Sequence, residues 1–269
     1  ASYAFISRVQ IGESEPDSPL LARDHDFNLS TKAINERFPG SEELNIIIRT
    51  DEAGGIKKPE VMAAVKRFQA LMMTDPSVGG TRGLPLIVSV FNRLTHSDDP
   101  RWMQTPTSTA ETGGLMFAYM ASSPIPGALK EFITPEDTEA NLVFYYKDHQ
   151  ATTITRANAM ALEGKKMIEA EVPGVHVELA GGIIGVNAAG NIALHRDHMI
   201  IIPMVLLLSF LLVAVYYQSF HAGWLMIFPM LFATAMTYAY MGWKNIGINV
   251  NTVPVITVGV GVGIDYAVY

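Results

Sequence analysis

The chain has 269 residues, of which 49% are hydrophobic, and a formal net charge of −7. The charges are concentrated before Met199, because from Met199 to Tyr269 the only Asp, Glu, Lys or Arg residues are Lys244 and Asp265. Globular chains carry about a quarter charged residues, so the two parts are expected to face different solvents. The mildly acidic first part has no basic stripe, which argues against a nucleic-acid partner. The absence of cysteine excludes a disulfide framework, a thiolate metal site and a cysteine nucleophile.

Residues 1–27 are predicted to form an extended lead-in. The stretch is rich in proline, serine and acidic residues, and Pro16 and Pro19 prevent a continuous helix. The N-terminus has no charged region followed by an apolar core and a cleavage site, so no signal peptide is predicted. The chain also stops inside an apolar run. We therefore expect both ends to be cuts through a longer protein.

An α/β domain is predicted over residues 28–190. The short β-branched run Leu44–Ile48 predicts a mostly buried strand. A helix is expected from Pro59, a residue that suits a first helical turn, to the glycine pair Gly79-Gly80. Its apolar residues recur at spacings of four, three and four and form one stripe. They are Val61, Val65, Phe68 and Met72.

The second half of this domain repeats the pattern. Asn141–Lys147 predicts a strand rich in valine, phenylalanine and tyrosine, and Thr152–Ala170 contains good helix formers with one apolar side. Val175–Leu179 alternates strictly and predicts a last strand. Between the halves, residues 84–132 are interpreted as a helical insertion. The order strand, helix, strand, insertion, strand, helix, strand predicts an α+β fold of the ferredoxin-like, or split βαβ, class.

The insertion contains more soft apolar surface than a small domain needs to bury. Methionine-rich surfaces adapt to varied ligands, so we expect these residues to line a route for an apolar substrate. The alternative, of equal weight, is that they pack the insertion onto the core. The residues are Leu115, Met116, Phe117, Tyr119 and Met120.

Residues 191–269 are predicted to form a transmembrane region with spans at about 197–217, 224–242 and 252–269. A membrane-spanning helix needs about 20 apolar residues, because it rises about 1.5 Å per residue across about 30 Å of hydrocarbon. Aromatic residues lie at the ends of these runs, where interfacial side chains belong. The alternative is that the runs are three buried helices of a water-soluble protein. The core of such a protein rarely contains three such runs in succession.

The charged segment His195–His198 precedes the first span. We interpret it as a polar collar at the water interface in preference to a metal site, and no metal is predicted. The loops between the spans contain a single basic residue, Lys244, so the positive-inside rule does not determine orientation and, if anything, opposes the orientation adopted below.

Asp265 is the most informative residue for function. It lies 14 residues after Asn251, which is about 21 Å along a helix and well inside a layer about 30 Å thick. A carboxylate there costs about 2.5–3.5 kcal/mol, and such residues usually relay protons or bind ions. Tyr266 is adjacent but about 100° around the helix, so it would serve a relay through a neighbouring helix. The alternative is a structural carboxyl group satisfied by neighbouring hydroxyls.

Three glycines, Gly259, Gly261 and Gly263, precede this aspartate. A dinucleotide-binding loop requires a strand-to-helix turn, which a membrane span does not offer. Gly259 and Gly263, four residues apart, instead predict a small-residue face for close helix packing. No catalytic constellation, phosphate-binding loop or cofactor motif is present, so we predict neither an enzyme nor a cofactor.

Taken together, these segments resemble the resistance-nodulation-division (RND) superfamily of exporters. The run Val258–Tyr269 is similar to that family's glycine-rich helix with an Asp-Tyr pair, in the MMPL-like branch of large mycobacterial membrane proteins and hydrophobe exporters. Ser18–Leu21 and Asn35–Gly40 are similar to the entrance of the periplasmic domain of that branch. The resemblance covers essentially the whole chain.

The resemblance implies a proton-driven exporter in the bacterial inner membrane, built of two similar halves with a large periplasmic domain in each. Asp265 and Tyr266 match the positions that carry protons, and the periplasmic domain receives a hydrophobic or lipid substrate. The chain would be about half of one repeat, more in keeping with the second, and would have the other repeat as its partner. A homo-oligomer and a periplasmic partner are both left open.

Two rival functions share this architecture. A sterol-sensing or receptor-type membrane protein uses a related aspartate-containing helix for regulation, and an accessory subunit of protein export has the same fold. Two repeats, each with an intramembrane aspartate, would favour export, whereas an appended signalling domain would favour sensing.

Overall fold

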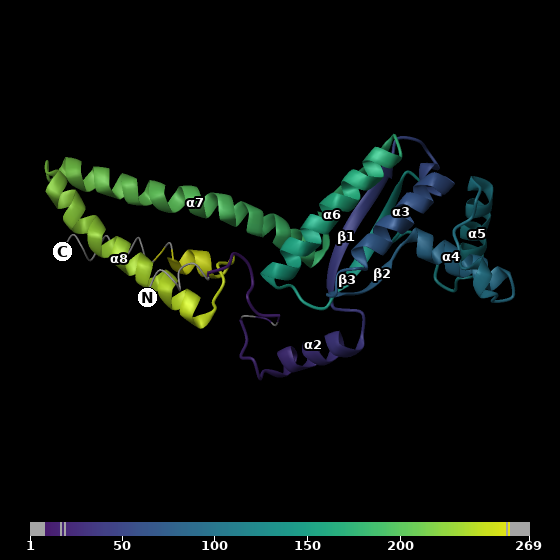
Figure 1. Ribbon diagram of the computed structural model, residues 1–269, viewed down its shortest axis with the longest axis horizontal. Coiled ribbons are helices and arrows are strands. Elements are labelled where there is room, and N and C mark those ends of the chain that lie inside the picture. The colour runs from purple at the N-terminus through teal and green to yellow at the C-terminus, as the bar shows by residue number, and fades with distance from the viewer. Residues whose placement is uncertain (1–8, 17, 19, 257, 259–269) are drawn as a thin grey trace. The chain divides into compact units, whose positions relative to one another are not determined.

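The computed structural model of the chain describes residues 9–16, 18, 20–256 and 258. It divides into two compact units, one made of residues 20–186 and the other of residues 1–19 and 187–269. We call the first the α/β unit and the second the helical unit (Figure 1).

The α/β unit is built on a four-stranded antiparallel sheet with the strand order β2-β3-β1-β4. The strands are β1 Glu42–Thr50, β2 Val78–Arg82, β3 Glu139–Tyr146 and β4 Val175–Gly181. The central strands β1 and β3 pair Leu44 with Phe144 and Ile46 with Leu142, so apolar side chains lie opposite one another across the ladder. Such cross-strand pairs stabilise a sheet, and these four residues are all buried.

Two helices, α3 Pro59–Met72 and α6 Ala151–Glu171, lie side by side across the sheet (Figure 1). The predicted stripe of α3 is buried, with Phe68 and Met72 fully enclosed. Gly164 lets α6 approach, because a Cβ atom there would lie 2.1 Å from Cε2 of Phe68. In β4, Val175 and Val177 are buried while His176 and Glu178 are exposed, as the alternation predicted. The core therefore lies between this pair of helices and one face of the sheet.

Two elements differ from the sequence interpretation. The helix α2, Asp26–Arg37, has no counterpart among the predicted elements, and most of its apolar side chains are exposed. Strand β2 contains Gly79 and Gly80, which the sequence indicated only as the end of α3. Pro39 crowds both glycines, because a Cβ atom on Gly79 would lie 2.1 Å from the Pro39 carbonyl oxygen and one on Gly80 would lie 2.9 Å from Pro39 Cβ.

The insertion between β2 and β3 contains α4 Leu84–Thr95, the 3₁₀ helix η2 Pro100–Trp102 and α5 Thr109–Ser122. Ser108 caps α5, because its side-chain oxygen accepts a hydrogen bond from the backbone N–H of Glu111. A second 3₁₀ helix, η1 Gly55–Lys57, precedes α3 and contacts α5. The T-shaped contact of Phe91 with Tyr119, with ring centroids 5.7 Å apart, joins α4 to α5.

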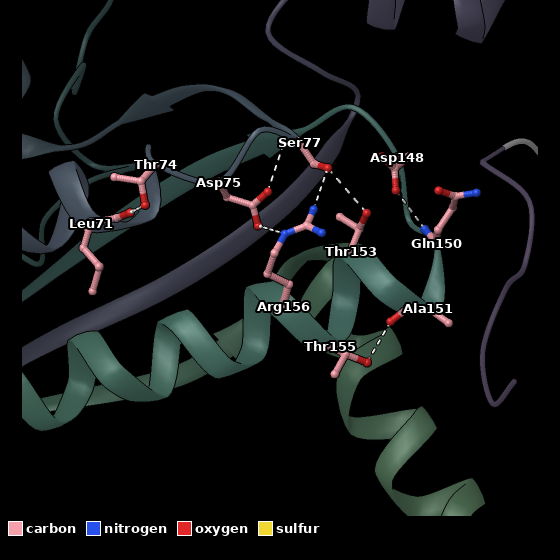
Figure 2. A network of polar contacts seen from close by, with 10 residues as sticks. All are labelled: Leu71, Thr74, Asp75, Ser77, Asp148, Gln150, Ala151, Thr153, Thr155 and Arg156. Carbon is pink, nitrogen blue, oxygen red and sulfur yellow. Dashed lines mark hydrogen bonds and ion pairs between the residues drawn. The ribbon is translucent and has the colours of Figure 1, made fainter.

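A polar network ties the turn before β2 to the first turns of α6 (Figure 2). The Asp75 carboxylate, whose side chain is fully buried, accepts hydrogen bonds from Arg156 Nε at 2.8 Å and from the Ser77 backbone N–H at 2.9 Å. Arg156 Nη2 donates to Ser77 Oγ at 2.8 Å. The hydrogen bond to Asp75 raises the pKa of Arg156, which keeps the guanidinium charged.

The helical unit contains most of α7 Gly182–Tyr216 and all of α8 Phe220–Lys244. Within the part of the chain that the structure describes, these two helices are long and apolar enough to cross a membrane. Ile227 and Met230 of α8 pack against α7. The rings of Phe210 in α7 and Trp224 in α8 form a T-shaped contact with centroids 5.6 Å apart. The polar segment before the first predicted span belongs to α7, whose 35 residues correspond to about 52 Å.

Candidate functional site

The predicted intramembrane site lies outside the described residues. This applies to Gly259, Gly261 and Gly263 and to the pair Asp265 and Tyr266. The structure does describe where the helix that precedes them begins, at Thr252.

Asn249 organises the start of this third apolar helix. Its side-chain oxygen accepts hydrogen bonds from the backbone N–H groups of Asn251 and Thr252, both at 2.9 Å. In return, the Asn249 backbone N–H donates to Thr252 Oγ1 at 2.8 Å. Reciprocal bonds of this kind satisfy the backbone donors that a helix N-terminus leaves free.

The same asparagine holds the segment at the start of the chain. Asn249 Nδ2 donates to the Glu13 carboxylate, with both oxygens at 2.9 Å. Beside it, the backbone N–H of Gly12 donates to the Ile248 carbonyl oxygen at 2.8 Å, and the backbone N–H of Ile248 donates to the Gln10 carbonyl oxygen at 2.8 Å. A small apolar cluster of Met241, Ile248 and Ile256 packs against Val9 and Ile11. Residues 9–14 are thereby fixed to the loop that leads into the third apolar helix.

The α/β unit contains an open cavity of about 330 Å³ beside α5, which we call the insertion cavity. Gly113, Met116 and Met120 line it from α5, and their spacings of three and four place them on one helix face. Leu129 and Ile133 contribute further apolar side chains from the segment before β3. Most of the lining is therefore apolar, and its two methionine side chains are flexible and polarizable.

Charged groups lie at the edge of the insertion cavity. Lys57 Nζ and the Asp137 carboxylate form an ion pair of 2.6 Å, and their side chains are 25% and 21% exposed. Backbone hydrogen bonds from Gly54 to Glu136 and from Ile56 to Asp137 hold η1 against the same turn. Lys130, the third charged residue of the lining, is exposed.

The structure separates the five residues predicted to line a substrate route. Met116 and Met120 lie in the cavity wall, where Met116 is buried and Met120 is 44% exposed. Tyr119 instead packs on Phe91 of α4, which fits the alternative that this residue holds the insertion together. Leu115 is half-buried and Phe117 is 69% exposed, and neither lines the cavity.

Sequence reasoning missed several lining residues. Lys57 precedes α5 by about fifty positions, and Leu129, Lys130, Ile133 and Asp137 follow it after an irregular segment. No spacing rule relates positions so far apart, so only the fold brings them together. The methionines of α5 were the one signal in the sequence that pointed to the cavity.

The chain therefore combines a mixed α/β unit with two helices that are long and apolar enough to cross a membrane. The chain belongs to the MMPL family, whose family model matches residues 19–269. This membership confirms the resemblance drawn from the sequence and places the protein among RND-type membrane transporters of hydrophobic substrates. Among curated proteins, none matches the chain significantly.

Proposed function

We propose that this protein exports hydrophobic or amphiphilic molecules, most simply lipids, across the bacterial inner membrane and uses the proton gradient to do so. The observation that carries the proposal is the insertion cavity, a methionine-lined space in the α/β unit of a chain from a transporter family. Ligand sites for small apolar molecules are concave, are lined mainly by apolar side chains, and begin at about 300 Å³.

The α/β unit would be a periplasmic porter domain of the ferredoxin-like class. The antiparallel strand order β2-β3-β1-β4 supports this assignment, as do the two helices α3 and α6 that follow β1 and β3. In this arrangement α7 and α8 would be the first two membrane helices of the chain, and the helix from Thr252 would be the third.

Asp265 and Tyr266 would be the proton relay of this third helix, and the small face at Gly259 and Gly263 would let a partner helix come near the carboxyl group. A proton that crosses with the membrane potential releases about 2.3 kcal/mol per 100 mV. No phosphate-binding loop was found in the sequence, so the proton gradient is the energy source that its motifs support.

The experiment is export by the full-length protein in vesicles under an imposed pH gradient. Asp265→Asn keeps the size of the side chain but cannot titrate, so it should insert normally and abolish gradient-driven export. Lys244→Gln is the matched control, because it removes the other charge of the C-terminal region and should leave export near the wild-type rate. Wild-type export by Asp265→Asn would disprove the proton-carrier role and favour the structural interpretation of this carboxyl group.

A further inference from the structure

The insertion cavity has an unequal charge distribution along its lining. The positive charge of Lys57 is matched by Asp137 at 2.6 Å. Lys130 has no carboxylate within ion-pair distance among the described residues, so the lining carries one unmatched positive charge. An apolar space with one unpaired cation at its edge is complementary to a molecule with an apolar body and one anionic group.

The position of Lys130 is set by the chain around it. Gly127 adopts a left-handed conformation with φ of 74°, and the backbone N–H of Lys130 donates to its carbonyl oxygen at 2.9 Å. The aliphatic stem of Lys130 folds over this glycine, since a Cβ atom there would lie 2.8 Å from Lys130 Cδ. Both residues line the cavity, so the stem forms part of the wall while the ammonium group stays in water.

The size of the cavity limits the apolar part of such a ligand. A methylene group occupies about the volume of a water molecule, roughly 30 Å³, so about 330 Å³ accommodates on the order of ten methylene groups. That corresponds to one alkyl chain of medium length.

We propose that the insertion cavity binds a single alkyl chain whose anionic head group is held at the rim by Lys130. This inference rests on the proposed function in treating the cavity as a cargo site, and it adds the ligand class and the residue that selects it. Lys57 contributes through its stem, because its ammonium group is already engaged with Asp137.

Adjacent glycines on α5 offer a matched pair of variants. A Cβ atom on Gly113 would meet only Lys57 Cδ, at 3.9 Å, so a leucine there extends into the cavity without a backbone clash. Gly114 does not line the cavity and has nothing within 4 Å of a Cβ atom. Gly113→Leu should therefore fill the site, while Gly114→Leu makes the same chemical change outside it.

The test is photolabelling of the full-length protein in phosphatidylcholine nanodiscs at pH 8 with photoreactive decanoate. Labelled peptides are then identified by mass spectrometry. The wild type and Gly114→Leu should be labelled within residues 109–137, and Gly113→Leu should reduce that labelling about tenfold. Lys130→Gln should reduce it about fivefold and Lys130→Arg should restore it, since an exposed charge contact is worth about 1 kcal/mol.

Competition separates the head group from the chain. Unlabelled decanoate should displace the probe, and decyltrimethylammonium should not. If Lys130→Gln were labelled like the wild type, or if the cation competed as well as the anion, the assignment of the head group would be wrong. If Gly113→Leu were labelled like the wild type, the cavity would not be the binding site. The assay needs no proton gradient, so its failure is distinguishable from a failure of the export experiment.

Discussion

The hydroxyl group of Tyr146 is buried at the end of β3, and it has no hydrogen-bond partner among the described residues. Burial raises the pKa of Tyr146 above its usual value, and the nearby Asp75 carboxylate raises it further. The folded state therefore favours the neutral phenol, whereas the unfolded chain ionises near pH 10. A raised pKa means that this contribution to stability is complete below pH 10 and is lost as the pH rises further.

Tyr146→Phe should therefore raise the free energy of unfolding at pH 7 by about 1 kcal/mol, because it removes a buried hydroxyl group that has no hydrogen-bond partner. Its advantage should increase between pH 10 and pH 11. Urea unfolding of the α/β unit, followed by circular dichroism at pH 7 and pH 11, measures both effects. A stability difference that stays constant with pH would show that Tyr146 does not contribute to alkaline unfolding.

The buried Asp75 carboxylate depends on Arg156 for its charge balance. Arg156→Met should destabilise the α/β unit by about 2–3 kcal/mol, below the range for fully buried pairs because the arginine side chain is 40% exposed. The comparison is Arg67→Met, which breaks the surface pair with Glu171 and should cost less than about 1 kcal/mol. In a double-mutant cycle with Asp75→Asn, a coupling energy near zero would contradict this role.

At the scale of the elements, the contact of α3 with α6 depends on the absence of a side chain at Gly164. Alanine there should gain up to about 1 kcal/mol in helix propensity and lose about 1–3 kcal/mol in overpacking, since the ring of the fully buried Phe68 occupies the position of the added methyl group. Gly114→Ala in α5 meets open space and should show only the gain. Thermal unfolding of both variants checks the signs, and stabilisation by Gly164→Ala would refute the close contact.

The elements also show how far the sequence alone predicts this fold. The strands predicted at Leu44–Ile48, from a β-branched run, and at Val175–Leu179, from strict alternation, match β1 and β4, because both patterns report on burial. Strand β2 was not located, since Gly79 and Gly80 favour a turn when their neighbour Pro39 is unknown. For the cavity, the α5 methionines were a usable signal, but its charged residues come from segments joined only by tertiary contacts.

For the whole molecule, the division into two units has a consequence for folding. Residues 20–186 hold the sheet, α3, α6 and the insertion, and the largest fully buried side chains of the described residues all lie within this unit. We expect this fragment, produced alone, to fold into a water-soluble monomer that unfolds cooperatively. Circular dichroism and analytical ultracentrifugation test this, and an aggregated or unfolded fragment would show that the core requires the helical unit.

One junction links the sheet to the first apolar helix without a linker. Strand β4 ends at Gly181 and α7 begins at Gly182, whose φ is 75° and whose Cβ position, if filled, would lie 2.1 Å from the Glu43 carbonyl oxygen. In a flexible linker, a rotation of the helix about its axis would be absorbed by changes in the φ and ψ angles of several residues. With no spare residue between them, a rotation of the first turn of α7, which belongs to the α/β unit, acts directly on the backbone of β4, so this junction is a torsional coupling between a helix and a β-sheet.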